Sequence, residues 1–222
     1  MGVLIAGGTG ALGSAVVREL IDAGYDCTVT WVVEKELERA REELGDRVQF
    51  VRADLVDPAG GADEAVAAVD DLEAVVDLVG GFSDGPLVHE TSWDEFDRML
   101  RLNIAPAFNL AHAAMPGLVE RGGGAFVAVS ARAALRPFSG AAGYITAKAA
   151  VIAFIQALDA EYRKQGVRAN AILPSVIDTP ANREAMPESE WHKLVPPERI
   201  ASVIAFLCSD RSSAINGAEI PV

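Results

Sequence analysis

The sequence predicts a single-domain α/β protein whose parallel, seven-stranded sheet is doubly wound, with helices on both faces. Three observations predict it. Short apolar runs alternate with segments of helical periodicity along all 222 residues. The sequence contains no internal repeat, low-complexity tract or long linker, and its length suits one domain with a large core. The candidate functional motifs follow apolar runs, and ligands bind beyond the carboxyl ends of the strands in such a fold.

The expected strands are short and apolar enough to be buried on both faces of a sheet. Right-handed crossovers through the intervening helices would keep them parallel. The strands are expected at residues 3–6, 27–33, 48–51, 74–79, 125–129, 167–173 and 219–222.

The expected helices show apolar residues at spacings of three and four. The helix over 11–22 stops at Gly24, and a charged amphipathic helix over 34–44 ends at Gly45. A long helix over 93–119 contains Pro106, which is expected to interrupt or bend it. The remaining helices are expected at residues 62–69, 142–165 and 199–208.

Composition excludes several classes of function. The net charge is −13 and the pI about 4.6, which argues against binding nucleic acid or acidic membranes. No stretch reaches the roughly 18 uncharged apolar residues of a membrane span. Two cysteines and three scattered histidines predict neither a disulfide framework nor a metal site. We therefore expect a cytoplasmic protein with a small-molecule substrate.

A glycine-rich turn joins the first strand to the first helix. Gly8, Gly10 and Gly13 fit the G-x-G-x-x-G fingerprint of the Rossmann dinucleotide-binding fold. Such a turn brings backbone close to a pyrophosphate, and the helix N-terminus offers free N–H groups and a positive dipole end. The alternative is a glycine turn with a structural role only.

The choice between NAD and NADP depends on the end of the second strand. An acidic residue there would hold the ribose 2′-OH of NAD, and a basic one the 2′-phosphate of NADP. Trp31 occupies this place, Glu34 follows it, and no Arg or Lys stands there. The sequence therefore leans toward NAD. Asp54, after the third strand, either meets the adenine or caps its own loop.

Tyr144 and Lys148 open the helix that follows the fifth strand. Their i, i+4 spacing puts both side chains on one helical face, within reach of one ligand. A tyrosine of ordinary pKa near 10 is a poor acid or base at neutral pH. A nearby ammonium and a cationic nicotinamide would lower the pKa toward the working range. The alternative is a surface tyrosine and a solvated lysine.

Together these motifs resemble those of the short-chain dehydrogenase/reductase family over essentially the whole chain. The resemblance implies an NAD(P)-dependent oxidoreductase that moves a hydride to or from a small carbonyl, alcohol or activated imine. It implies that Tyr144 donates the proton, that Lys148 also binds ribose hydroxyls, and that Asn103 holds a water of a proton relay. Asn103 could instead cap or kink its helix. The implied cofactor contacts come from Gly7, Thr9, Gly10, Leu12, Gly13, Trp31, Asp54, Leu55, Gly80, Tyr144, Lys148, Pro174, Ile177 and Thr179.

The chain departs from the family pattern at several places. Ala11 replaces a family glycine, so Gly10 is expected to carry the turn. Asp77-Leu78-Val79-Gly80 stands where the family has Asn-Asn-Ala-Gly. The substrate-orienting serine, thirteen residues before the tyrosine, is replaced by Ala131. Ser130 is adjacent but alternation along a strand points it to the other face, unless the backbone is irregular.

Quinonoid dihydropteridine reductases are a branch of the family that tolerates this alanine. The chain resembles them at residues 131–135, 143–148 and 178–187. Their conjugated imine substrate needs less polarisation than a ketone. In a site that acts on a ketone, loss of one hydrogen-bond donor could cost ~3 kcal/mol of transition-state stabilisation. The same stretches are found in reductases of unknown substrate, so the generic oxidoreductase is preferred and the pterin substrate is an alternative. A catalytically weak nucleotide sensor or scaffold on the same fold is another.

Two further expectations concern the substrate and the assembly. Residues 180–197, between the sixth strand and the next helix, are placed to form a lid. Phe82, Arg132, Met186 and Trp191 are candidates to line the substrate cavity, although the apolar ones could simply be core. The helix over 142–165 is apolar on more than one face, which predicts a homodimer or homotetramer.

Overall fold

The computed structural model describes residues 1–222 and contains one seven-stranded sheet, with all neighbouring strands parallel and in the order β3-β2-β1-β4-β5-β6-β7. The predicted fold class is therefore confirmed. The order reverses direction between β1 and β4, which is where ligands bind in doubly wound sheets. The strands are β1 (Gly2–Ala6), β2 (Asp26–Trp31), β3 (Val48–Arg52), β4 (Leu72–Asp77), β5 (Gly124–Val129), β6 (Val167–Leu173) and β7 (Glu219–Pro221).

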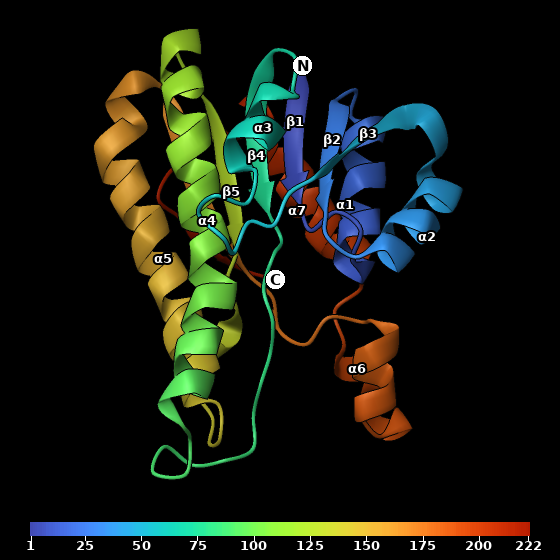
Figure 1. The fold of residues 1–222 in the computed structure, drawn as a ribbon, viewed down its shortest axis with the longest axis vertical. Coiled ribbons are helices and arrows are strands. Elements are labelled where there is room, and N and C mark those ends of the chain that lie inside the picture. Colours follow the sequence, from blue (N-terminus) through green and yellow to red (C-terminus); the bar gives the residue numbers. More distant parts are fainter.

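Helices cover both faces of this sheet, with α4 and α5 standing side by side on one face and α1 and α7 on the other (Figure 1). Each layer closes its own apolar core, one of 23 buried residues and one of 22. Burial of this apolar surface is the main force that holds the layers together. The helices are α1 (Ala11–Asp22), α2 (Glu34–Leu44), α3 (Ala62–Ala67), α4 (Trp93–Arg121), α5 (Ala142–Tyr162), α6 (Pro180–Ala185) and α7 (Pro197–Cys208).

Helices α1 and α2 have the predicted bounds, whereas α3 and α5 end two and three residues earlier, α4 ends two residues later and α7 begins two residues earlier. The predicted interruption at Pro106 is wrong, because α4 runs unbroken through both Pro106 and Pro116; the alternative, a bend there, stays a prediction. Each proline removes one N–H bond, but tight packing of α4 on α5 and on the sheet keeps the helix continuous. Helix α6 was not expected, and it begins where Thr179 caps the backbone N–H of Asn182.

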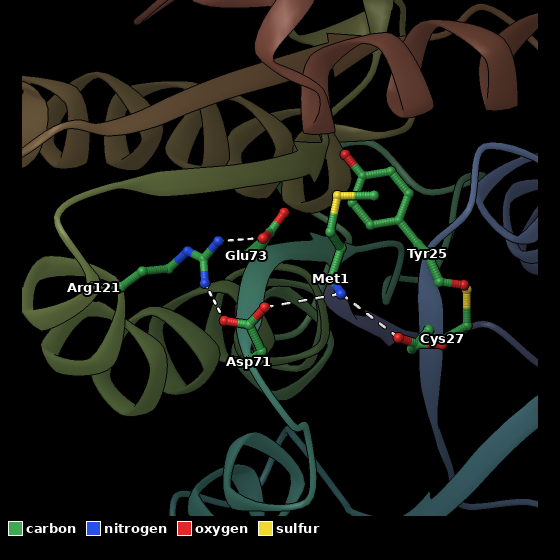
Figure 2. Close-up of polar contacts among 7 residues, drawn as sticks. Met1, Tyr25, Cys27, Asp71, Glu73 and Arg121 are labelled. Atoms are coloured by element: carbon green, nitrogen blue, oxygen red, sulfur yellow. Dashed lines mark hydrogen bonds and ion pairs between the residues drawn. The ribbon is translucent and has the colours of Figure 1, made fainter.

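The amino ends of the strands are closed by charged groups (Figure 2). Arg121, the last residue of α4, forms ion pairs with Asp71 and Glu73, and the N-terminal ammonium lies 3.9 Å from Asp71. Beside them the Cys27 thiol points back to the Tyr25 carbonyl, 3.8 Å away. Candidate functional motifs are absent here and gather at the opposite, carboxyl ends of the strands.

Helix α5 is long and apolar enough to pass for a membrane span by length and composition, although Lys148 and Asp159 interrupt its uncharged run. Its packing gives another reason for this composition. Val151, Ile155 and Leu158 are buried in the core between α5 and the sheet. A core helix passes the same test.

Candidate active site

The glycine turn connects β1 to α1 at the centre of the sheet. Gly7 adopts φ +74°, in the region that favours glycine, and its carbonyl accepts a hydrogen bond from the Gly10 N–H. Gly10 has φ −75° and is the N-cap of α1, so the expectation that Gly10 carries the turn is wrong. Gly7 does so, because the chain reverses direction immediately after β1. Gly13 is buried in the first turn of α1.

The first turn of α1 has the donors that a pyrophosphate needs. The backbone N–H groups of Ala11, Leu12 and Gly13 donate to no acceptor of the chain, and the first helical bond runs from the Ser14 N–H to the Gly10 carbonyl. Such N–H groups and the helix dipole favour anions. The residues present therefore fit the dinucleotide that the sequence predicted.

The start of α2 reaches back to the same turn. The buried Thr9 hydroxyl donates to the Glu36 carboxylate at 3.1 Å, and the Arg39 guanidinium donates to the Thr9 carbonyl at 2.7 Å. Trp31 ends β2 and is half-buried beside this region. Sequence reasoning missed Glu36 and Arg39, although their i, i+3 spacing on the helix after β2 puts both on one face.

The loop after β3 presents Asp54 and Leu55. The exposed Asp54 carboxylate accepts from the Val56 N–H at 3.1 Å, so it caps its own loop. Leu55 is buried, and its carbonyl accepts from the Asn109 side chain of α4 at 2.9 Å. This bond fixes the loop against the helix and makes Asn109 a third residue that the sequence did not reveal, after Glu36 and Arg39.

Tyr144 and Lys148 extend from the first two turns of α5. Lys148 is buried, with 6% of its surface exposed, and its ammonium donates to the Val129 carbonyl at the end of β5, at 2.9 Å. Burial raises the pKa of the Tyr144 phenol above its ordinary value of 10.0. The expected lowering by the ammonium is thus not a property of the chain alone. A raised pKa keeps the phenol protonated at neutral pH, as a proton donor requires.

Gly80 separates Lys148 from Asn103. A Cβ at Gly80 would lie 2.6 Å from the Asn103 Oδ1 and 2.9 Å from the Lys148 Nζ, so a larger residue would force one of these side chains to move. The Asn103 amide clamps the next residue: it accepts from the Gly81 N–H and donates to the Gly81 carbonyl, both at 3.1 Å. It also donates to the Met99 carbonyl one turn earlier in α4, at 2.9 Å. Asn103 thereby ties α4 to the loop beside Lys148.

Ser130 does not face the crevice. Its hydroxyl is 2% exposed and donates to the Lys148 backbone carbonyl at 2.7 Å, as strand alternation predicts. Ala131 adopts an extended conformation, φ −157° and ψ 152°, and is buried. No backbone irregularity turns Ser130 toward Tyr144, so its structural place is under α5, where it fixes the helix that bears Lys148.

The segment after β6 forms one edge of the site and then the predicted lid. Pro174 is buried, and its carbonyl accepts from the Arg132 N–H at 2.9 Å. The Ile177 carbonyl accepts from the Asn182 side chain at 2.8 Å. Thr179 is the N-cap of α6, which lies beyond the carboxyl ends of the strands (Figure 1).

The four candidate substrate residues fall into two groups. Phe82 is 58% exposed and packs edge-on against Tyr144, with ring centroids 5.0 Å apart. Arg132 is exposed at the end of β5. Met186 and Trp191 lie in the segment predicted to be a lid, where the Trp191 indole N–H reaches the Met186 carbonyl at 3.4 Å. The structure adds Phe138, whose ring centroid lies 6.5 Å from that of Phe82.

A cradle for an anionic dinucleotide lies at the carboxyl ends of the strands, together with the half-buried Tyr144 and the buried Lys148. This combination defines a class of protein, the nucleotide-dependent oxidoreductases. Comparison with known proteins agrees. A family model described as enoyl-(acyl carrier protein) reductase matches residues 7–222. The chain belongs to the short-chain dehydrogenase/reductase family and is an NAD(P)-dependent oxidoreductase.

Individual relatives cover almost the whole chain. It is 31% identical to a 3-beta-hydroxysteroid dehydrogenase of Comamonas testosteroni, over 98% of this chain and 92% of that protein. It is 30% identical to a 4-formylbenzenesulfonate dehydrogenase of the same organism, over 99% and 94%. A short-chain type dehydrogenase/reductase structure from Mycobacterium ulcerans superposes with a TM-score of 0.92 at 25% identity, over 100% and 87%. These relatives lend no support to a pterin reductase or a scaffold.

Proposed function

We propose that Tyr144 is the general acid/base of the hydride transfer, with Lys148 as its helper. The observation that carries this proposal is the position of the two side chains. They lie one helical turn apart at the carboxyl ends of the strands, where the glycine turn also lies. In this proposal Asn103 holds the Gly80–Gly81 wall in place and supports a proton relay, and the residues implied by the family resemblance bind the cofactor. Ser130 acts only by positioning α5.

The proton chemistry follows from the surroundings of each group. The bound nicotinamide would supply or accept the hydride. Tyr144, protonated at neutral pH because burial raises its pKa, donates a proton to the oxygen or nitrogen that becomes negative during reduction. The Lys148 ammonium stabilises the phenolate left behind and donates to ribose hydroxyls. In the oxidative direction each transfer runs in reverse.

The surroundings of Tyr144 favour an apolar substrate that is already activated. Ala131 offers no hydroxyl to polarise a carbonyl. The exposed ring of Phe82 lies beside the phenol, and the exposed ring of Phe138 lies next to Phe82. We expect a small carbonyl, alcohol or conjugated imine with an apolar face toward Phe82. Arg132 and the lid residues Met186 and Trp191 would complete the cavity. The sequence similarity to pterin reductases supports the imine only as the weaker candidate.

The proposed cofactor preference is NAD. Glu36 places a carboxylate on the turn that would hold the adenosine ribose, and a carboxylate favours a diol over a phosphate. Arg39 is a basic residue that would favour the 2′-phosphate of NADP. Its guanidinium is already engaged, because it donates a hydrogen bond to the Thr9 carbonyl. Dissociation constants for NADH and NADPH test the balance. Glu36→Gln should narrow an NADH preference, whereas tighter NADPH binding that is lost in Arg39→Ala would reverse the assignment.

The segment over 180–197 is proposed as a lid over the substrate. Its own contacts make it a compact unit: Arg183 pairs with Asp178 and stacks 4.9 Å from the Trp191 ring centroid. The short chain from β6 connects this unit to the sheet, and the isolated bridge between Ile177 and Val195 pairs the residues on either side of it. Such a unit can move as one body over the end of the sheet.

We further propose that the protein is a cytoplasmic homodimer or homotetramer. The outer face of α4 and α5 exposes Phe108, which is 54% accessible and lies near Phe154, and small residues including Ala149 and Ala153. An exposed apolar face of paired helices suits a second copy of the chain. Both cysteines are free and buried, as suits a reducing compartment. Sedimentation velocity tests the oligomer, and a monomer at micromolar concentration would contradict it.

Turnover assays test the catalytic proposal. Oxidation of NADH and NADPH is measured with a panel of aldehydes, ketones, quinones and a quinonoid dihydropterin. Tyr144→Phe should lower kcat by about 10²–10⁴-fold and leave cofactor affinity unchanged. Tyr162→Phe, on the last turn of the same helix, is the matched control and should keep full activity. Unchanged turnover in Tyr144→Phe would contradict the mechanism; tight cofactor binding without any turnover would favour a nucleotide sensor.

A further inference from the structure

Asp77 places a buried carboxylate at the carboxyl end of the central strand β4. Its side chain is 2% exposed, and its Oδ1 accepts from the Val79 N–H at 3.0 Å. No other hydrogen bond or ion pair to this carboxylate exists in the chain. A buried carboxylate with a single N–H partner is costly, because removal of the charge from water must be offset by other interactions.

The Lys148 ammonium is the positive charge that acts on this carboxylate. In the sheet register Asp77 lies beside Ala128 of β5, and the next carbonyl of that strand, Val129, accepts from Lys148. Lys148 therefore reaches from α5 to the end of the strand that neighbours Asp77. The Gly80 backbone passes against the same ammonium on its other side. The two charges share one small region, at a distance greater than that of a direct ion pair.

The two groups act on each other electrostatically. Burial raises the pKa of Asp77 to about 6, and the Val79 N–H and the Lys148 charge oppose that rise. Burial lowers the pKa of Lys148 to about 8, and the Asp77 charge opposes that fall. The neighbouring elements β1, β5 and α4 present Ala6, Ala128 and Asn103, none of which titrates. Tyr144 is the third titratable group of this region, and it is neutral at pH 7.

We propose that Asp77 is a positioning residue whose negative charge keeps the buried Lys148 protonated, and so keeps it able to bind the cofactor ribose and to assist Tyr144. This inference rests on the function proposed above. It gives a role to a residue at which the chain departs from the asparagine of its family. An asparagine could accept the same Val79 N–H bond but could not supply the charge.

The sign of the effect follows from linkage. Without the Asp77 charge, Lys148 would lose its proton at lower pH, because the bond to the Val129 carbonyl alone would then oppose the desolvation of the ammonium. Neutral lysine is a weaker donor to ribose hydroxyls than the ammonium. Cofactor affinity should therefore fall as pH rises into the alkaline range in the natural protein. Once the Asp77 charge is removed, the same fall should begin at a lower pH.

The test is cofactor binding by Asp77→Asn between pH 6 and pH 9, followed by NADH fluorescence. In the natural protein the dissociation constant should rise with a midpoint near pH 8. In Asp77→Asn the midpoint should fall by about one pH unit, so that affinity at pH 8 drops about fivefold. Asp159→Asn, a second buried carboxylate far along α5, is the control and should leave the midpoint unchanged.

Two outcomes of this titration would overturn the inference: an unshifted midpoint in a folded Asp77→Asn variant, or pH-independent binding by the natural protein. Failure of the natural protein to bind NADH or NADPH at all would instead overturn the proposed function. The two failures are therefore distinguishable.

If Asp77→Asn does not fold, the reciprocal variant Lys148→Met decides the question through thermal unfolding. The pKa of folded Asp77 lies above its ordinary 3.8, so the stability that this group contributes is fully present below that value and is lost as pH rises toward about 6. Loss of the ammonium should raise that pKa further. The Tm of Lys148→Met should thus keep falling above pH 6, relative to the natural protein. Parallel Tm curves from pH 4 to pH 8 would contradict the coupling.

Discussion

The ring of Phe82 lies edge-on to the ring of Tyr144, with centroids 5.0 Å apart and planes at 85°. Phe82 belongs to the loop after β4, whereas Tyr144 belongs to α5, so two segments distant in sequence meet at the phenol that we propose as the acid/base group. The loop that bears Phe82 is joined to the loop before α5 by a bond from the Gly85 N–H to the Gly140 carbonyl, at 2.9 Å. The phenol is thus shielded on one side by an exposed aromatic wall.

Phe82→Ala should weaken substrate binding more than it weakens folding. The ring is 58% exposed, so its loss removes little buried surface, and stability should fall by about 1 kcal/mol or less. The Tyr144 phenol would become more hydrated. We expect KM for apolar substrates to rise about tenfold, with the cofactor dissociation constant unchanged. Phe108→Ala, exposed on the outer side of α4, is the control, and equal effects of both variants on KM would contradict the assignment.

Ala131→Ser should add a hydrogen-bond donor to the site. The alanine stands where the family orients its substrate with a serine, and its extended backbone accepts any residue. A preorganised donor stabilises the charge that develops on a carbonyl oxygen. We expect kcat to rise about tenfold for ketones, equivalent to ~1.4 kcal/mol, and little for activated imines. A uniform fall for every substrate would show that the natural cavity has no room for the hydroxyl.

Gly80→Ala should damage the site without unfolding the protein. The added methyl would meet the Asn103 amide oxygen and the Lys148 ammonium, and one of them must move. We expect kcat/KM to fall at least tenfold and Tm to fall by a few degrees. Gly117→Ala provides the control, because nothing lies within 4 Å of that added methyl in α4. It should raise stability by about 0.5–1 kcal/mol and leave activity unchanged.

Thr179→Val should loosen the proposed lid. The hydroxyl oxygen caps the Asn182 N–H at the start of the short helix α6, and N-cap loss typically costs about 1 kcal/mol. We predict faster hydrogen exchange over residues 180–193 and a raised substrate KM. Unchanged exchange there would show that the contacts of Arg183 and Trp191 suffice to hold the lid.

The sequence predicted the sheet well because its strands are buried on both faces. Such strands are continuous apolar runs, and β6 begins and ends where the alternation of segments placed it. Helix α2 likewise has a local start signal, its acidic first turn, and a local stop signal, Gly45. The errors arose where tertiary packing decides. Packing against α5 keeps α4 helical through Pro106, which local propensity alone would interrupt.

The sequence indicated the candidate site residues that belong to local motifs. It did not indicate residues whose hydrogen-bond partners are distant along the chain. Tyr144 and Lys148 share one helix, so their spacing was informative. Arg39 reaches the Thr9 carbonyl across 30 positions, and Asn109 reaches the Leu55 carbonyl across 54, so no local pattern indicates either. The same limit applied to Asp77, whose departure from the family was visible although its proximity to Lys148 was not.

A crystal structure with NADH or NADPH bound would test the central claim most directly. We predict the pyrophosphate at the first-turn N–H groups of α1, the nicotinamide ring beside Tyr144, and a ribose hydroxyl about 3 Å from the Lys148 Nζ. A dinucleotide bound away from the glycine turn, or Tyr144 and Lys148 both turned away from the ring, would contradict the account.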